Sequence, residues 1–194
     1  SILDSSSLKS YEEFTKNITK VAKDSKIKRV IYLSSIHVYK NNLEGLITEK
    51  TSPVNNHPYS LYKLAGEKVI RTSFGSDPNK AIILRLSNIF GYPIEKKVNC
   101  WNLFMNNICK EIVQNKTITI KSNPLIKKDF LSVKCFCEII LKLSSFNFSN
   151  VHCNIINLGS ENAITLLDAA KFIREIYFEK NKIKININNL KPGK

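Results

Sequence analysis

The chain has 194 residues, 43% of them hydrophobic, and 30 basic against 16 acidic side chains give it a formal charge of +14. This length and apolar content exclude a disordered chain and predict one domain, or a domain and a half, around a buried core. No apolar run reaches the roughly 20 residues of a membrane-spanning helix, so we expect no transmembrane segment and no membrane partner.

The positive charge does not by itself predict nucleic-acid binding. Only four of the 30 basic residues are arginines, and the lysines are scattered along a chain that is also rich in Ile and Asn. A nucleic-acid module typically clusters its arginines on one surface. We therefore expect no nucleic-acid partner, and an anionic small-molecule substrate fits the charge equally well.

In chain order, the hydrophobic periodicity predicts helices and strands that alternate. In the first half we expect a helix over 11–23, a strand over 29–33, a loop over 41–58, a helix over 59–72 and a strand over 81–86. In the second half we expect helices over 99–115, 132–143 and 165–178, the last capped by Thr165, and strands over 117–120, 154–158 and 183–187. Because the early strands are continuous apolar runs, the pattern indicates an α/β fold with a parallel sheet covered by helices on both faces.

Five cysteines, an odd number, predict free thiols rather than a disulfide framework. Cys135 and Cys137 form a C-x-C pair, but no second pair lies at zinc-ligand spacing, so we expect no metal site. Cys109 and Cys135 have apolar neighbours at helical spacing, which predicts that they are buried. Buried thiols are typical of a reducing cytoplasm, where we place the protein.

One group of residues indicates a site for acid/base catalysis. The strand over 29–33 runs into Ser34 and Ser35, and a predicted helix begins 24 residues after Ser35 with Tyr59, followed by Lys63. Residues at i and i+4 share a helix face, and an ammonium beside a phenol favours the phenolate that a general base near neutral pH needs. By itself the pattern also fits a half-buried tyrosine and a solvated lysine.

Five segments carry motifs that are far more specific in this order than any one alone. They are 31–39 (IYLSSIHVY), 58–67 (PYSLYKLAGE), 84–91 (LRLSNIFG), 128–133 (KDFLSV) and 154–159 (NIINLG). Together they resemble the extended short-chain dehydrogenase/reductase family, and within it the NAD-dependent epimerase/dehydratase group that acts on nucleotide sugars. The resemblance covers nearly the whole chain and implies a Rossmann-like parallel sheet with a smaller C-terminal α/β substrate lobe.

The resemblance implies a role for each matched residue. Tyr59 would be the catalytic acid/base, and Lys63 would stabilise its phenolate and hydrogen-bond the nicotinamide ribose. Ser35 would bond the substrate hydroxyl or ketone, with Ser34 as the less favoured choice. Asn88 would contact the substrate near its diphosphate, and Lys128 would meet the diphosphate itself, although lysine lacks the bidentate fork of the arginine that the family usually carries there.

Neighbouring residues receive structural interpretations. Tyr62 does not share the helix face of Lys63, and His37 is expected in a loop after the strand without a catalytic role. Glu67 lies four residues after Lys63, which predicts an ion pair between them. We expect Asp129 to hold a turn.

The family binds its nicotinamide cofactor on a glycine-rich turn after the first strand. No two of the six glycines here lie close enough to form such a turn. The resemblance therefore implies NAD or NADP as cofactor, with the N-terminal cofactor-binding segment absent from this sequence. Residues 1–91 would be the C-terminal half of the Rossmann domain, and 92–194 mainly the substrate lobe, interleaved with the last Rossmann elements.

The implied function is an NAD(P)-dependent nucleotide-sugar epimerase or 4-keto-sugar reductase, in cell-surface polysaccharide synthesis. A dehydratase is disfavoured because Ile36 and His37 follow Ser35, where dehydratases usually carry Asp and Glu. The alternative is a truncated, non-catalytic remnant of the family that binds no cofactor. The implied partners are a nucleotide-sugar substrate and a second copy of the chain, in a homodimer formed through the catalytic helix.

Overall fold

The structure is a computed structural model that describes residues 5–40, 43–95, 97–149 and 151–189. The chain divides into two compact units, one of residues 1–87 and 139–158 and the other of residues 88–138 and 159–194. No helix among the described residues is both long and apolar enough to cross a membrane.

The first unit is built on a parallel sheet with strand order β1-β2-β6. Its strands β1 and β2 stand in register, with Val30 opposite Ala81 and Ser35 opposite Leu86. The elements of this unit are α1 (Ser5–Asp24), β1 (Val30–Ser35), the 3-10 helix η1 (Ile36–Val38), α2 (Pro58–Phe74), β2 (Ala81–Leu86), the last part of α4 (Val133–Ser145) and β6 (Ile155–Leu158).

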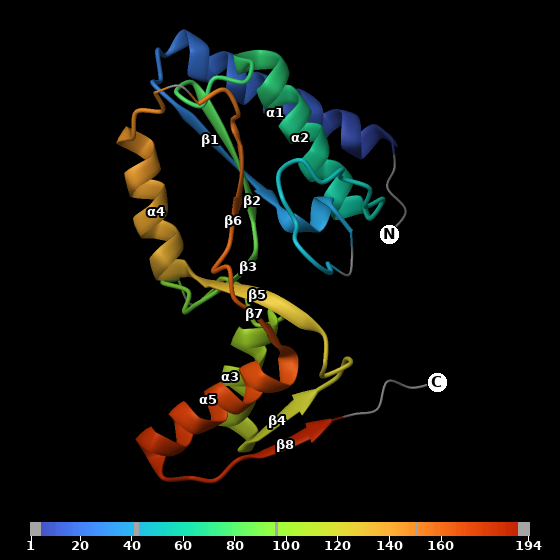
Figure 1. Cartoon of the computed structure of the whole chain (residues 1–194), viewed down its shortest axis with the longest axis vertical. Coiled ribbons are helices and arrows are strands. Elements are labelled where there is room, and N and C mark those ends of the chain that lie inside the picture. The colour runs from blue at the N-terminus through green and yellow to red at the C-terminus, as the bar shows by residue number, and fades with distance from the viewer. Residues whose placement is uncertain (1–4, 41–42, 96, 150, 190–194) are drawn as a thin grey trace. The chain divides into compact units, whose positions relative to one another are not determined.

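Helices lie on both sides of this sheet (Figure 1), which confirms the predicted α/β fold. Helices α1 and α2 lie side by side on one face, and the part of α4 that belongs to this unit lies on the other (Figure 1). Between α2 and the sheet, Ile70 of α2 packs against Ala81 and Ile83 of β2 in a buried apolar cluster. Since all three strands are parallel, their carboxyl ends meet at one edge, where such sheets bind ligands.

Helix α2 packs so closely on β1 that Gly66 has no room for a side chain. A Cβ atom there would lie 2.0 Å from the Tyr32 hydroxyl oxygen and 2.4 Å from Tyr32 Cζ. Tyr32 cannot easily turn away, because its hydroxyl lies 3.0 Å from that of Tyr11 and donates to the carbonyl oxygen of Lys63 at 3.2 Å.

Gly66→Ala is therefore expected to lower the free energy of unfolding by about 1–3 kcal/mol through overpacking, although alanine is the better helix former by about 1 kcal/mol. Urea denaturation measures the change. Gly66→Ala should lower the free energy of unfolding less in a Tyr32→Leu background than in the wild type. A Gly66→Ala protein as stable as the wild type would contradict the close contact between α2 and β1.

The second unit has a mixed sheet of order β3-β5-β7 and a separate parallel pair, β4 with β8. Strand β5 pairs parallel with β3 and antiparallel with β7. Its core is formed by Ile108 and Ile112 of α3, Ile118 and Ile120 of β4, and residues of α5. The elements are β3 (Asn88–Phe90), α3 (Phe104–Asn115), β4 (Thr117–Ile120), β5 (Lys127–Ser132), the start of α4, β7 (Ala163–Thr165), α5 (Leu166–Asn181) and β8 (Asn186–Asn189).

Several predicted elements need correction. The helix expected over 99–115 begins only at Phe104, and the strand expected over 183–187 lies instead at Asn186–Asn189, with Ile185 buried in the core just before it. Strands β3, β5 and β7 were not predicted. The cysteines are free, as expected, but each is exposed or half-buried rather than buried. Thr165 does cap α5, because its Oγ1 accepts from the Asp168 backbone N–H at 3.0 Å.

Candidate active site

The three predicted catalytic positions lie in the first unit, on two elements that pack together. Ser35 is the last residue of β1, and Tyr59 and Lys63 occupy the first two turns of α2. Ser35 is only 5% exposed, whereas Tyr59 is 47% exposed. A buried hydroxyl at the end of the strand therefore accompanies a phenol that a ligand can reach.

Local hydrogen bonds fix the start of α2. His57 is the N-cap, and its Nδ1 accepts from the backbone N–H of Tyr59 at 3.2 Å. Pro58 takes the first helical position, where a missing N–H costs nothing. His57 was not predicted as the cap. The hydrogen bond from its backbone N–H to His57 thus fixes Tyr59 in the first turn of α2.

His37 links Ser35 to the start of α2. The Ser35 Oγ accepts from the His37 backbone N–H at 3.2 Å, and the His37 carbonyl accepts from the Ser60 Oγ at 2.8 Å. The His37 ring lies edge-on to that of Tyr59, with centroids 6.5 Å apart. The expectation that His37 lies in a loop is wrong, since it belongs to η1. Ser35 and Tyr59 are thereby tied to one short segment.

Lys63 lies against Tyr59. Its Nζ is 5.6 Å from the centre of the Tyr59 ring and donates to the carbonyl oxygen of Leu33 at 2.8 Å. Burial lowers the pKa of Lys63 below the ordinary lysine value. The i, i+4 spacing thus brings the ammonium and the phenol together, and the end of β1 holds the ammonium in place.

Two other tyrosines near this site do not share the position of Tyr59. Tyr32 also lies beneath Lys63, at 5.8 Å from Nζ to the ring centre. Burial, followed by its hydrogen bond with Tyr11, raises the pKa of Tyr32 above the usual tyrosine value, so it stays a neutral phenol. Tyr62 packs edge-on against Tyr11, with ring centroids 5.3 Å apart. Tyr59 is the phenol of this group that combines exposure with a neighbouring ammonium.

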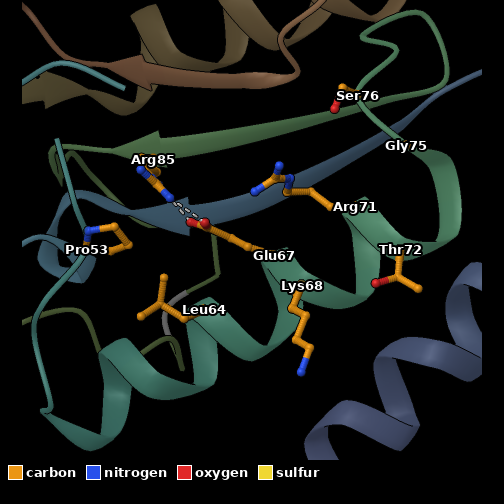
Figure 2. Close-up of a pocket in the computed structure, with 9 residues that line it drawn as sticks. All are labelled: Pro53, Leu64, Glu67, Lys68, Arg71, Thr72, Gly75, Ser76 and Arg85. Atoms are coloured by element: carbon orange, nitrogen blue, oxygen red, sulfur yellow. Dashed lines mark hydrogen bonds and ion pairs between the residues drawn. The ribbon is translucent and has the colours of Figure 1, made fainter. Parts of the chain in front are cut away.

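The predicted ion pair between Lys63 and Glu67 is wrong. Glu67 is 4% exposed, and its carboxylate accepts from Arg85 Nη2 at 2.6 Å and from Arg85 Nε at 2.9 Å (Figure 2). Ser34, the alternative to Ser35, also donates to Glu67, at 2.5 Å. The Glu67 side chain turns into the protein because a buried arginine on β2 lies there. Ser34 is occupied by this contact, which leaves Ser35 as the serine of the candidate site.

A cavity of about 440 Å³ lies beside the Glu67–Arg85 pair (Figure 2). Lys68 and Arg71 of α2 are among its lining residues, whereas Ser35, Tyr59 and Lys63 are not. It is therefore distinct from the candidate site.

The remaining predicted residues lie in the second unit, on β3 and β5. Asn88 donates through Nδ2 to the carbonyl oxygen of Asp129 at 2.9 Å, and Lys128 is half-buried on β5. The Asp129 carboxylate accepts from the backbone N–H and the hydroxyl of Ser160, at 3.0 and 2.8 Å. This confirms that Asp129 holds a turn. Substrate contacts by Asn88 and Lys128 stay predictions.

Ser87 is a polar residue that the sequence did not single out. It directly follows β2, at the carboxyl edge of the sheet, and its Oγ is buried with no hydrogen-bond partner among the described residues. A buried hydroxyl without a partner costs free energy unless a water or a ligand satisfies it. Apart from its place before Asn88, nothing in the sequence distinguishes Ser87 from other serines.

Comparison with known proteins places this site in context. The family model described as "NAD dependent epimerase/dehydratase family" matches residues 6–159. dTDP-D-glucose 4,6-dehydratase from Dictyostelium discoideum is 28% identical over 191 residues, which cover 88% of this chain and 42% of that protein. ADP-L-glycero-D-manno-heptose-6-epimerase from Brachyspira hyodysenteriae is 25% identical over 176 residues, 88% of this chain and 53% of that protein.

Solved structures share the fold. UDP-glucuronic acid 4-epimerase from Bacillus cereus, in complex with UDP-glucuronic acid and NAD, superposes with a TM-score of 0.69 at 20% identity. The superposition covers 94% of this chain and 55% of that one. The chain spans about half the length of the curated relatives it matches.

Proposed function

The chain belongs to the NAD dependent epimerase/dehydratase family, and on that premise we propose that it carries the acid/base site of a nucleotide-sugar epimerase or 4-keto-sugar reductase. The observation that carries the proposal is the placement of Lys63. The carbonyl oxygen of Leu33 holds its ammonium against the exposed Tyr59 ring. Leu33 lies two residues before Ser35, the last residue of β1.

In the proposed mechanism, Tyr59 is the acid and base. Its phenolate oxygen takes the proton of a sugar hydroxyl as the carbon is oxidised, and returns it when a ketone is reduced. Ser35 donates a hydrogen bond to the same sugar oxygen, which holds it beside Tyr59. The Lys63 ammonium stabilises the phenolate by its charge. Proton transfer by a positioned side chain of this kind contributes about 10²–10⁴-fold in rate.

The residues present fit a nicotinamide nucleotide at this edge of the sheet. An ammonium has three donors, so Lys63 can bond Leu33 and also the hydroxyls of a nicotinamide ribose. When bound, NAD or NADP supplies the acceptor and donor of the hydride. The chain's own part is to orient the sugar carbon and to move the hydroxyl proton through Tyr59.

For the substrate we propose a sugar joined to a nucleoside diphosphate. Lys128 and Asn88 would contact the diphosphate, and Lys128 would do so as a point charge rather than as a fork. An epimerase or a reductase is preferred over a dehydratase because Ile36 and His37 follow Ser35. The relatives include both epimerases and a dehydratase, so the family alone does not choose between them.

Turnover by the complete gene product on a panel of UDP-, GDP- and dTDP-sugars tests this proposal. Formation of an epimer without net cofactor consumption would establish an epimerase. Loss of a 4-keto sugar with an equal loss of NADH or NADPH would establish a reductase. No turnover on either class of substrate would contradict the proposal and favour a non-catalytic member of the family.

The proposal includes a homodimer through the helical face of the first unit. Phe14, Ile18 and Val21 form an exposed apolar stripe along α1, beside α2. Burial of such a stripe stabilises association, and a second copy of the chain is the expected partner. We expect light scattering to give twice the monomer mass for the complete gene product, and Ile18→Lys to shift it towards the monomer. A monomeric wild type at tens of micromolar would contradict the dimer.

A further inference from the structure

Two successive residues of β1 hold two successive turns of α2. The carbonyl oxygen of Leu33 accepts from Lys63 Nζ at 2.8 Å, and the hydroxyl of Ser34 donates to Glu67 Oε1 at 2.5 Å. Lys63 and Glu67 are one turn apart on α2. A slide of the helix along the strand by one turn would break both contacts at once.

Arg85 of β2 completes this arrangement. It forms two hydrogen bonds with the Glu67 carboxylate, and its Nη1 donates to the Tyr39 hydroxyl at 3.0 Å. Arg85 and Glu67 are each 4% exposed. A buried, two-point contact between a guanidinium and a carboxylate is directional, so it fixes an orientation as well as a distance.

The same group of side chains reaches the third strand. The Tyr39 hydroxyl donates to Asn157 Oδ1 at 2.7 Å, and the Asn157 backbone N–H donates to Glu49 Oε1, also at 2.7 Å. Contacts from Ser34, Arg85 and Asn157 therefore span β1, β2 and β6 within the first unit. One continuous set of hydrogen bonds joins the catalytic helix to all the strands of this sheet.

We propose that Ser34, Glu67 and Arg85 form a register clamp, which fixes α2 along β1 so that Lys63 meets the carbonyl oxygen of Leu33 and Tyr59 lies near Ser35. These three are positioning residues, since Lys63 and Tyr59 are the groups expected to touch substrate and cofactor. The inference rests on the proposed function in that it takes Tyr59 and Lys63 as the working pair.

Stability alone does not account for the clamp. Removing two charges from water is costly, and well-packed apolar side chains of similar volume often stabilise a protein as much as a buried ion pair does. Contacts between apolar side chains, however, do not fix an orientation as hydrogen bonds between a guanidinium and a carboxylate do. A clamp that fixes the helix register also explains why Ser34, next to the candidate catalytic Ser35, donates to Glu67 instead of to a ligand.

The test measures the surroundings of Lys63 in the 194-residue chain and needs no activity. Competitive acetylation across a pH range, followed by mass spectrometry, reports the pKa of the Lys63 amine. In the wild type this pKa lies below the ordinary lysine value because the amine is buried, with Tyr59, Tyr32 and the Leu33 carbonyl facing it. In Ser34→Ala and Glu67→Gln the pKa is expected to shift up towards the ordinary value, because Lys63 loses its fixed place.

Two variants make the test decisive. Ile82→Ala removes a buried side chain from the opposite face of β2, so it lowers stability without touching the clamp. Ser34→Thr keeps the hydroxyl, so the pKa of Lys63 in this variant should equal that in the wild type. Ser34→Ala also leaves the Glu67–Arg85 pair intact, so it serves if Glu67→Gln does not fold.

The clamp is overturned if Ser34→Ala leaves the pKa of Lys63 unchanged, or if Ile82→Ala shifts it equally. In the complete gene product, Ser34→Ala should lower kcat more than it raises KM. A shifted pKa in a protein that turns over no nucleotide sugar would support the clamp and reject the proposed function, so the two failures are distinguishable.

Discussion

Tyr59→Phe is expected to lower kcat of the complete gene product by about 10²–10⁴-fold, the usual contribution of a positioned acid/base. The variant keeps the ring beneath the Lys63 ammonium but removes the oxygen that would exchange the proton. KM should change little, because substrate binding would rest mainly on other groups. Since Tyr59 is 47% exposed, the free energy of unfolding should stay within about 0.5 kcal/mol of the wild type.

Tyr62→Phe is the matched control for this loss. Tyr62 lies on the same helix, three residues on, but packs against Tyr11 instead of Lys63. It should retain the wild-type kcat. Equal activity of the Tyr59→Phe protein and the wild type, or equal losses in both variants, would show that Tyr59 is not the acid/base.

Arg85→Met is expected to destabilise the fold by about 3–5 kcal/mol, because it leaves the buried Glu67 carboxylate without its partner. Burial acts to lower the pKa of the Arg85 guanidinium, but the hydrogen bonds with Glu67 and Tyr39 outweigh it and raise the pKa above the usual arginine value. Urea denaturation gives the free energy of unfolding of the variant.

The double variant Glu67→Leu/Arg85→Met isolates the pair. With both charges removed, most of the lost stability should return, as in other buried pairs replaced by apolar side chains. Arg71→Met, an exposed arginine on α2, should change stability by less than about 0.5 kcal/mol. Additive losses in the double variant would contradict direct coupling between Glu67 and Arg85.

Local spacing made part of the site predictable. The contact of Tyr59 with Lys63 needs only a helix, and the hydrophobic periodicity was enough to predict one over 59–72. The buried strand over 81–86 was equally clear, since an unbroken apolar run of that length is typical of the centre of a parallel sheet. Short elements were less visible. Strand β5, with the sequence KKDFLS, carries three charges and no apolar run that would mark it.

The rest of the site depends on contacts between distant parts of the chain. Glu67 was assigned to Lys63 because four residues separate them, yet its partner is Arg85 on β2. Likewise, two adjacent serines look the same in the sequence, and only the packing of α2 shows that Ser34 faces Glu67. The spacing along a helix shows which side chains share a face of it. It does not show whether a charge on the neighbouring sheet lies closer to Glu67 than Lys63 does.

A crystal structure of the complete gene product with a nucleotide sugar and NAD tests the central claim most directly. The account predicts that the Ser35 Oγ and the Tyr59 hydroxyl both lie within about 2.6–3.2 Å of one sugar oxygen, with Lys63 on the nicotinamide ribose. A sugar bound away from the carboxyl end of β1, or one that contacts neither hydroxyl, would contradict it.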